Sequence, residues 1–256
     1  MDLHISGKRA LVMGASRGLG RAVAEGLLAE GVEVIAVARQ TDAIHAWAGG
    51  VANLTAIAAD LTDVASINTL ADNVLADGGI DILINNSGGP APGAAASVAR
   101  SDWMAQFEAM AANLFHLTGL LLPGMRQRNW GRIITIASSG VEQPIANLAM
   151  SNGIRAAVVG WSKTLAAEVA TDGVTVNIVM PGRIQTTRVD ELDAAAANRT
   201  STPIETVRKT SAAAIPAGRY GRPEEFAAMV VFLASQNASY VTGSRLRVDG
   251  GAIRSI

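Results

Sequence analysis

The chain has 256 residues, of which 49% are hydrophobic and 17% are charged, so it is long and apolar enough to bury one large α/β core. Its formal net charge is −1, which gives no reason to expect nucleic acid or a membrane as a partner. The absence of cysteine excludes disulfides and thiolate metal sites, and the three histidines are scattered, so we expect no bound metal. No apolar run reaches transmembrane length and the first residues lack a signal peptide's apolar core, so a cytoplasmic protein is expected.

The stretch Lys8–Arg39 predicts one βαβ unit. Short β-like runs at 10–13 and 32–38 flank a helical pattern, and glycines mark the turn between the first strand and the helix. These glycines are Gly14, Gly18 and Gly20. A glycine-rich turn lets the backbone approach a ligand closely, and the helix that follows directs free N–H groups and its positive dipole end at an anion. The unit therefore predicts nucleotide binding, typically through a pyrophosphate.

Apolar β-like runs alternate with helical patterns through the rest of the chain. The further expected strands cover 54–58, 80–84, 132–137, 174–180 and 246–248. The expected helices between them cover 62–76, 101–128, 150–171 and 223–234. Such alternation predicts a single Rossmann-type α/β domain over 1–256, in which a doubly wound parallel sheet of about seven strands has helices on both faces and ligands at the carboxyl ends of its strands.

The segment at about 183–218 interrupts this alternation. It contains two polar, Ala-rich helical stretches between strands. An insertion of this size at this position predicts a helical lid that shapes the substrate site. The alternative is a surface helical hairpin with no part in binding.

The end of the second strand indicates the cofactor. A Rossmann-type site that binds a ribose 2′-hydroxyl holds an acidic residue there, whereas this chain has Ala38 and Arg39. Arg17 adds a second guanidinium within the glycine-rich turn. Two cations favour a 2′-phosphate, so we expect NADP(H) rather than NAD(H). The alternative is that both are ordinary solvated arginines.

The glycine-rich turn reads GASRGLG, and its G-x3-G-x-G spacing resembles the first turn of the short-chain dehydrogenase/reductase superfamily, TGxxxGxG, with Met13 in place of the Thr. Further segments resemble motifs of the same superfamily in the same order. They are Asp60–Leu61, Asn85-Asn86-Ser87-Gly88, Pro181-Gly182 through Thr186, GRYGRPEE at 218–225 and VTGSRLRVDGG at 241–251. The resemblance covers the whole chain, and within the superfamily the chain resembles the 3-oxoacyl carrier-protein reductases.

This resemblance implies a cofactor site along the strand ends. The residues that it implies for NADP(H) binding are Gly14, Ser16, Arg17, Gly18, Leu19, Gly20, Ala38, Arg39, Asp60, Leu61, Asn86, Ser87, Gly88, Arg155, Pro181, Gly182, Ile184 and Thr186.

The same resemblance implies an Asn–Ser–Tyr–Lys catalytic set, from which the chain departs. Ser138 stands at the position of the Ser, but Ser151 and Arg155 stand where Y-x-x-x-K is expected, and Met110 stands where the Asn would fall. Both tyrosines of the chain lie far beyond this helix, so the usual dyad is absent whatever the register. The expected active site is therefore atypical.

The missing tyrosine leaves proton transfer without an obvious donor. Ser151 and Arg155 share one helix face, and the Arg155 fork of donors suits ribose hydroxyls. An arginine is not expected to titrate, and a serine hydroxyl is a far poorer acid than a phenol, whose ordinary pKa is about 10. Losing a positioned acid or base costs roughly 10²–10⁴ in rate. Candidate substitutes for the proton donor are His116, Ser139, Glu142 and Gln143, and Asn113, one turn after Met110, is a candidate to replace the missing Asn in part. For Glu142 and His116 the simpler interpretation is a solvated or packed side chain.

Two functions from different classes follow from these residues. The first is an NADP(H)-dependent oxidoreductase that transfers hydride between the nicotinamide and a small ketone or alcohol, with non-standard proton transfer and with Ser138, Ser151 and Arg155 as catalytic residues. The second is a cofactor-binding protein with little or no dehydrogenase activity, serving as a sensor or an oligomer partner. The helices at 101–128 and 150–171 carry more apolar surface than one sheet face needs, which predicts a homotetramer or a homodimer.

A carrier-protein substrate would need a basic docking surface on this chain. Arg126, Arg128 and Arg132 could contribute to one, whereas Asp172 and the near-neutral net charge argue against it.

Overall fold

A seven-stranded parallel sheet in the order β3-β2-β1-β4-β5-β6-β7 forms the centre of the computed structural model, which describes residues 1–256. The strands are β1 (Arg9–Met13), β2 (Glu33–Ala38), β3 (Leu54–Ala58), β4 (Ile82–Asn85), β5 (Gly131–Ile136), β6 (Val174–Pro181) and β7 (Arg245–Val248). The order reverses between β1 and β4. A ligand site is therefore expected outside the carboxyl ends of these two strands.

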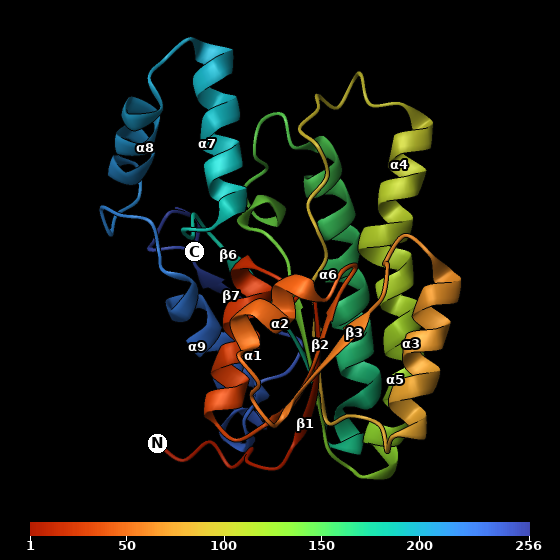
Figure 1. Ribbon diagram of the computed structural model, residues 1–256. Helices are drawn as coiled ribbons and strands as arrows, with labels where there is room; N and C mark the ends of the chain where they lie inside the picture. The colour runs from red at the N-terminus through yellow and green to blue at the C-terminus, as the bar shows by residue number, and fades with distance from the viewer.

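Helices cover both faces of this sheet (Figure 1). The α-helices are α1 (Gly18–Ala29), α2 (Asp42–Ala48), α3 (Val64–Ala76), α4 (Arg100–Phe107), α5 (Asn113–Gln127), α6 (Ala149–Val169), α7 (Thr187–Thr200), α8 (Ile204–Ala213) and α9 (Pro223–Ala234). A π-helix, η1 (Glu108–Ala112), joins α4 to α5, and short 3₁₀ turns are η2 (Ser139–Val141), η3 (Ala170–Asp172) and η4 (Gln236–Ala238). None of the helices combines the length and the apolar character that a bilayer-spanning segment requires.

The strands alternate their side chains between two hydrophobic clusters. In β1, Ala10 and Val12 pack into the cluster formed with α1 and α9, whereas Leu11 and Met13 pack into the cluster formed with α3, α5 and α6. A strand that is buried on both faces must be apolar at every position, which is why β1 reads as an unbroken apolar run. The doubly wound α/β fold expected from the sequence is confirmed.

The helices differ from expectation at two places. The sequence pattern predicted no helix at α2, which spans only seven residues and ends at Gly49 in a left-handed conformation. The continuous helix expected over 101–128 is divided by the π-helix around Met110. A π-helix inserts a residue into the helical register, and a hydrophobic repeat reports the register on each side of it but not the insertion.

Helices α7 and α8 form the insertion at 183–218 and project beyond the carboxyl ends of the strands (Figure 1). The two ends of the insertion pair with each other, because the backbone N–H of Gly221 donates to the Arg183 carbonyl at 2.9 Å. The fully buried Asp193 of α7 accepts a hydrogen bond from the Tyr220 hydroxyl at 2.9 Å and forms an ion pair with Arg183. This buried carboxylate holds α7 to both ends of the insertion.

Candidate active site

The turn after β1 requires glycine at two positions. A Cβ on Gly14, whose φ is +65°, would lie 2.7 Å from the Asn86 side-chain nitrogen, and a Cβ on Gly20 would collide with the Gly14 carbonyl oxygen. The positive φ and the Asn86 side chain thus disfavour a side chain at Gly14, and the close approach of the Gly14 backbone excludes one at Gly20. The turn forms a bare backbone cradle at the point where the strand order reverses.

Two further contacts complete this cradle. The Asn86 side chain follows β4 and donates to the Met13 carbonyl at 3.1 Å, which ties β4 to β1 across the reversal point. Helix α1 begins at Gly18, so its first N–H groups have no intrahelical partners and face the cradle with the positive end of the helix dipole. Such an arrangement binds a phosphate group.

Arginines surround the neighbouring strand end. Arg39 directly follows β2, and Arg17 immediately precedes α1; both are exposed. Asp60, after β3, accepts the Thr62 backbone N–H at 2.9 Å, and this bond holds the pKa of Asp60 below its ordinary value, with Arg39 adding to the shift. No carboxylate stands directly at the end of β2, so the charge there is positive.

Ser138 and Arg155 lie at the carboxyl end of β5. The Ser138 hydroxyl accepts the Gly140 N–H at 3.1 Å, which leaves its own proton available to a ligand. Arg155, on α6, donates to the Ile136 carbonyl at 2.8 Å. Burial, with the charge of Arg188 adding, lowers the pKa of Arg155 to about 10, so this guanidinium is still protonated at neutral pH. Ser151 lies one turn earlier on the same helix and is half-buried.

The loop after β4 connects the cradle with α6. Its Gly93 N–H donates to the Asn147 carbonyl at 2.7 Å, and the Ala149 N–H donates back to Gly93 at 3.2 Å. Arg188 of α7 donates to the Pro90 carbonyl of the same loop at 2.9 Å. Arg188 was not among the residues predicted from the sequence, although its position two residues beyond Thr186, close to a strand end, was the available signal.

The loop after β6 forms the far side of the site. A Cβ on Gly182 would lie 2.7 Å from the Asp249 Cα atom, and a Cβ on Gly18 would lie 3.6 Å from the Thr186 methyl carbon. Ile184 is buried and bridges to Gly221. Pro181–Gly182 and Thr186 therefore stand at the same edge of the sheet as the glycine-rich turn.

Three of the candidate substitutes are engaged elsewhere. Glu142 is neither solvated nor free, because its nearly buried carboxylate is paired with Arg247 and lies 3.8 Å from Arg245. Asn113 is buried and donates to the Leu61 carbonyl at 2.7 Å, so it does not replace the missing Asn. The His116 ring lies 2.6 Å from the Asn68 side chain at the surface between α5 and α3. The stand-in roles considered for Glu142, Asn113 and His116 are therefore wrong.

The position of the missing Asn is apolar in three dimensions as well as in sequence. Met110 lies in the π-helix and packs with Met150 and Ile154 in a small buried cluster. The Tyr220 hydroxyl donates to Asp193, so this phenol anchors α7. Burial raises the pKa of Tyr220, which makes this phenol a weaker acid than an ordinary tyrosine.

The three arginines considered for carrier-protein docking do not form a basic surface. Arg126 is paired with Asp172 at 2.6 Å, and Arg128 lies 3.3 Å from Asp81. Arg132 is buried and donates to the Ser235 carbonyl at 3.0 Å. Their charges are neutralised or internal, and the docking surface is not present.

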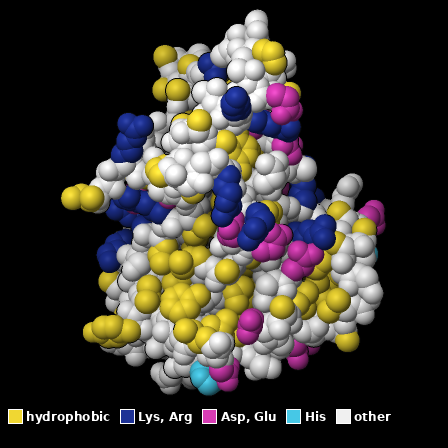
Figure 2. Space-filling model, turned by 90° about the vertical axis from the view of Figure 1, so that its left-hand side faces the viewer, with side chains coloured by type: hydrophobic (Ala, Val, Ile, Leu, Met, Phe, Trp, Pro, Cys, Tyr) yellow, Lys and Arg dark blue, Asp and Glu magenta, His cyan; other side chains and the backbone are white.

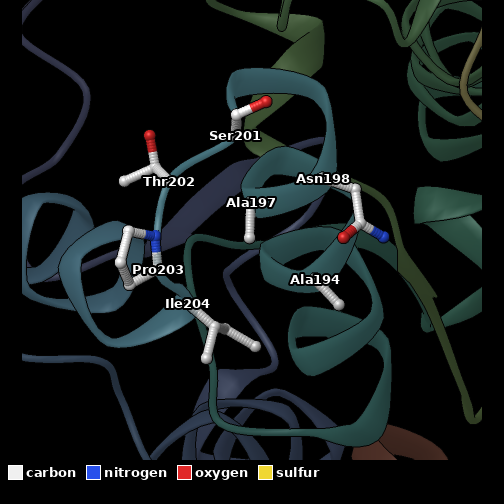
Figure 3. Close-up of a pocket in the computed structure, with 7 residues that line it drawn as sticks. All are labelled: Ala194, Ala197, Asn198, Ser201, Thr202, Pro203 and Ile204. Atoms are coloured by element: carbon white, nitrogen blue, oxygen red, sulfur yellow. The ribbon is translucent and has the colours of Figure 1, made fainter.

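A hollow of about 550 Å³ lies between α7 and α8, away from the strand ends (Figure 3). It is lined by Ala194, Ala197, Asn198, Ser201, Thr202, Pro203 and Ile204. None of these side chains is titratable or charged, so the hollow has no group for acid, base or phosphate chemistry. It reflects small side chains on the facing sides of the two helices.

The reversal of strand order, the glycine cradle and the Ser138–Arg155 edge together define an oxidoreductase of the short-chain dehydrogenase/reductase superfamily. Residues 14–252 match the family model described as enoyl-(acyl carrier protein) reductase, and the chain belongs to this family. It is 38% identical to the 3-oxoacyl-acyl-carrier-protein reductase FabG of Salmonella typhimurium, over 97% of this chain and 98% of that protein.

Solved structures of reductases share this fold. The L-sorbose reductase from Gluconobacter frateurii, complexed with NADPH and L-sorbose, has a TM-score of 0.94 and 33% identity, with 100% of both chains covered. A single-residue variant of the actinorhodin polyketide ketoreductase, with NADPH, has a TM-score of 0.91 and 31% identity, with 97% of this chain and 98% of that chain covered.

Proposed function

We propose that the chain is an NADP(H)-dependent oxidoreductase that transfers hydride between the nicotinamide and a small ketone or alcohol, with non-standard proton transfer. The observation that carries this proposal is the alignment of a bare glycine cradle, a free helix N-terminus and the Ser138–Arg155 pair along one sheet edge. The relatives that share the fold are reductases, two of them in complex with NADPH.

The residues of the cradle fit this cofactor. The N–H groups at the start of α1 suit the diphosphate, and the lack of any side chain at Gly14 and Gly20 leaves room for it. Arg17 and Arg39 suit a 2′-phosphate. Arg155 and the loop from Asn86 to Gly88 suit the nicotinamide ribose, with Thr186 at the opposite side.

When bound, NADPH supplies the hydride that adds to the carbonyl carbon. Ser138 donates its free proton to the carbonyl oxygen as a hydrogen bond, and the protonated Arg155 would hold the nicotinamide ribose in position. Ser151 or a water then delivers the proton to that oxygen. Because serine is a weak acid, we expect turnover below that of a tyrosine-containing site.

We further propose that α7 and α8 act as the lid of this site and that the chain assembles as a homotetramer or a homodimer. The lid role is supported by Arg188, which contacts the loop after β4, and by Glu191, which lies 3.7 Å from Arg17 of the glycine-rich turn. Both contacts join α7 directly to the walls of the site.

The test combines cofactor binding with turnover. We expect NADPH to bind with measurable affinity and to be oxidised in the presence of some members of a panel of ketones and aldehydes. Ser138→Ala should reduce turnover by at least tenfold without changing NADPH affinity, because its hydroxyl acts on the substrate. Arg155→Ala should weaken both. Ser239→Ala, at an exposed serine next to η4, is the matched control and should change neither.

A double variant, measured beside these proteins, helps to separate the oxidoreductase from the alternative of a cofactor-binding protein. If the site is an ordinary dehydrogenase site that has lost its acid, Ser151→Tyr combined with Arg155→Lys should raise turnover on generic ketones by tenfold or more, equivalent to about 1.4 kcal/mol. If the site has been rebuilt, the bulky phenol should abolish the native reaction. NADPH binding with no turnover by any of these proteins would refute the oxidoreductase and support a cofactor-binding protein.

A further inference from the structure

Arg188 lies at the start of α7, two residues beyond Thr186, and reaches back over the sheet edge. Its Nη2 atom donates to the Pro90 carbonyl at 2.9 Å. A Cβ on Gly89 would lie 3.4 Å from the same nitrogen, which is ordinary van der Waals contact, so the guanidinium lies directly against the backbone at Gly89. Arg188 thus rests on the loop after β4, at the point where the lid meets the body.

Arg155 lies near the start of the same loop, at the carboxyl end of β5. The loop is bonded through Gly93 to Asn147 and Ala149, directly before the turn of α6 that carries Ser151. Residues Asn85 of β4 and Thr135 of β5 are register partners, so the Ile136 carbonyl that accepts from Arg155 stands beside the start of the loop. Burial lowers the pKa of Arg155, and the charge of the half-exposed Arg188 adds to this shift, as expected of a nearby like charge.

These cations have little anionic compensation. Arg155 forms no ion pair, and its guanidinium is held by a backbone carbonyl. Glu191 lies 3.4 Å from Arg188 and 3.7 Å from Arg17, with half of its side chain exposed. An exposed ion pair of this kind stabilises little, so Glu191 can readily release Arg188. Figure 2 shows basic and acidic side chains gathered along the junction between the lid and the body.

We propose that Arg188 binds a carboxylate of the substrate, so that this oxidoreductase acts on short-chain oxo acids and the corresponding hydroxy acids. The inference rests on the proposed function and names its substrate class. A guanidinium fork matches a carboxylate in shape and charge, and Ser138 lies on the adjoining strand end to hold the carbonyl.

The diphosphate of the cofactor is the other oxyanion that Arg188 could meet. The observations favour the substrate, because the cradle at Gly14 and Gly20 and the start of α1 already provide a phosphate site. Arg188 contacts Gly89 and Pro90 instead, beyond the loop residues that suit the nicotinamide ribose.

The test measures binding to the protein saturated with NADP⁺, so that no turnover is needed. Calorimetric titration with 3-oxobutanoate and with 4-oxopentanoate is compared with titration of their methyl esters. We expect at least one acid to bind tenfold or more tightly than its ester. Arg188→Gln should remove this preference and Arg188→Lys should keep part of it. Arg199→Gln, which removes an exposed arginine at the far end of α7, should leave it intact.

A variant that is expected to strengthen the binding of the acid provides a second test. Glu191→Gln removes the carboxylate that competes for Arg188, so it should tighten the binding of the acid and leave that of the ester unchanged. Wild-type protein that binds acids no better than esters, or binds neither, would overturn the proposal. A loss of NADP⁺ affinity in Arg188→Gln with an unchanged acid preference would also overturn it and would assign Arg188 to the cofactor.

These outcomes are distinct from failure of the proposed function. Acid-selective binding without NADPH oxidation would keep the carboxylate site and refute the oxidoreductase. Reduction of neutral ketones with no preference for acids in binding would do the reverse.

Discussion

Arg17 and Arg39 are the side chains on which the choice of cofactor depends. Both are exposed at the carboxyl edge, and a charge-assisted hydrogen bond to a 2′-phosphate contributes about 1.5–3 kcal/mol. Because both are solvated, we expect the lower end of this range and NADPH affinity at least tenfold above that of NADH. Arg39→Asp should reverse much of the preference, since a carboxylate accepts from a ribose 2′-hydroxyl and repels a phosphate.

Direct titration of each cofactor checks this expectation. Arg21→Gln is the control, because Arg21 lies on the exposed face of α1 and pairs with Glu25 at 2.9 Å. It should leave the ratio of the two affinities unchanged. Equal affinities for NADPH and NADH in the wild-type protein would contradict the assignment of Arg17 and Arg39.

The role of a single residue was predictable from the sequence where local backbone geometry determines it. It was not predictable where the role depends on a partner that is distant in the sequence. Gly14 and Gly20 belong to a local turn whose spacing is visible in the chain. Glu142 is occupied by Arg247, more than a hundred positions away, and Asn113 by the Leu61 carbonyl. No local pattern encodes such pairings, so each of these polar residues could be mistaken for a catalytic group.

The start of α9 gives a pH-dependent prediction at the scale of an element. Hydrogen bonding to Arg219, together with the Arg222 backbone N–H, lowers the pKa of Glu225 from 4.5 to about 2. A carboxylate with a lowered folded-state pKa stabilises the fold above its unfolded value near 4.5 and loses this effect as the pH falls towards 2. Glu225 also caps the helix through the Arg222 N–H at 2.7 Å.

Thermal unfolding from pH 3 to pH 7 tests the role of Glu225. Glu225→Gln should lower Tm at pH 5–7, and the difference from wild type should shrink steadily below pH 4.5, because there the unfolded chain takes up a proton at this carboxylate that the folded protein does not. The neighbouring Glu224 is exposed and forms no ion pair, so Glu224→Gln should give a smaller difference throughout. A Glu225→Gln deficit that persists undiminished at pH 3 would contradict the assignment.

The elements followed from periodicity wherever packing dominates. All seven expected strands are present. The five inner strands β1, β2, β4, β5 and β6 are largely buried between two helical layers, which requires a continuous apolar run, whereas the edge strands β3 and β7 are only partly buried. Helix α2 was not predicted, because only Ile44 and Ala48 of its seven residues are buried and so few apolar positions show no helical period. The π-helix was not predicted, because it changes the hydrogen-bond register of the helix without changing the amino-acid composition.

At the scale of the whole molecule, much of the apolar surface expected at a subunit interface is internal. Leu114, Leu117 and Leu121 of α5 and Ile154 and Val158 of α6 are buried within one subunit. Because these side chains are already buried, they give no support to the predicted subunit interface.

What remains exposed still favours assembly. Met104 and Phe107 of α4 are 54% and 40% exposed, and α6 presents the small residues Ala156, Ala157 and Gly160 to solvent. Small residues let a second helix approach closely, and an isologous contact repeats each such surface twice. We therefore expect a dimer or a tetramer built on α4 and α6.

Phe107→Glu tests this interface, because it places a charge in the apolar contact and should shift the protein to a smaller species in sedimentation velocity at micromolar concentration. Leu75→Glu is the matched control: Leu75 is 43% exposed, close to the exposure of Phe107, but lies on α3. It should leave the oligomer intact, since solvent-exposed charge substitutions away from a contact change stability little. A wild-type protein that sediments as a monomer, or equal dissociation by both variants, would show that α4 and α6 do not form the interface.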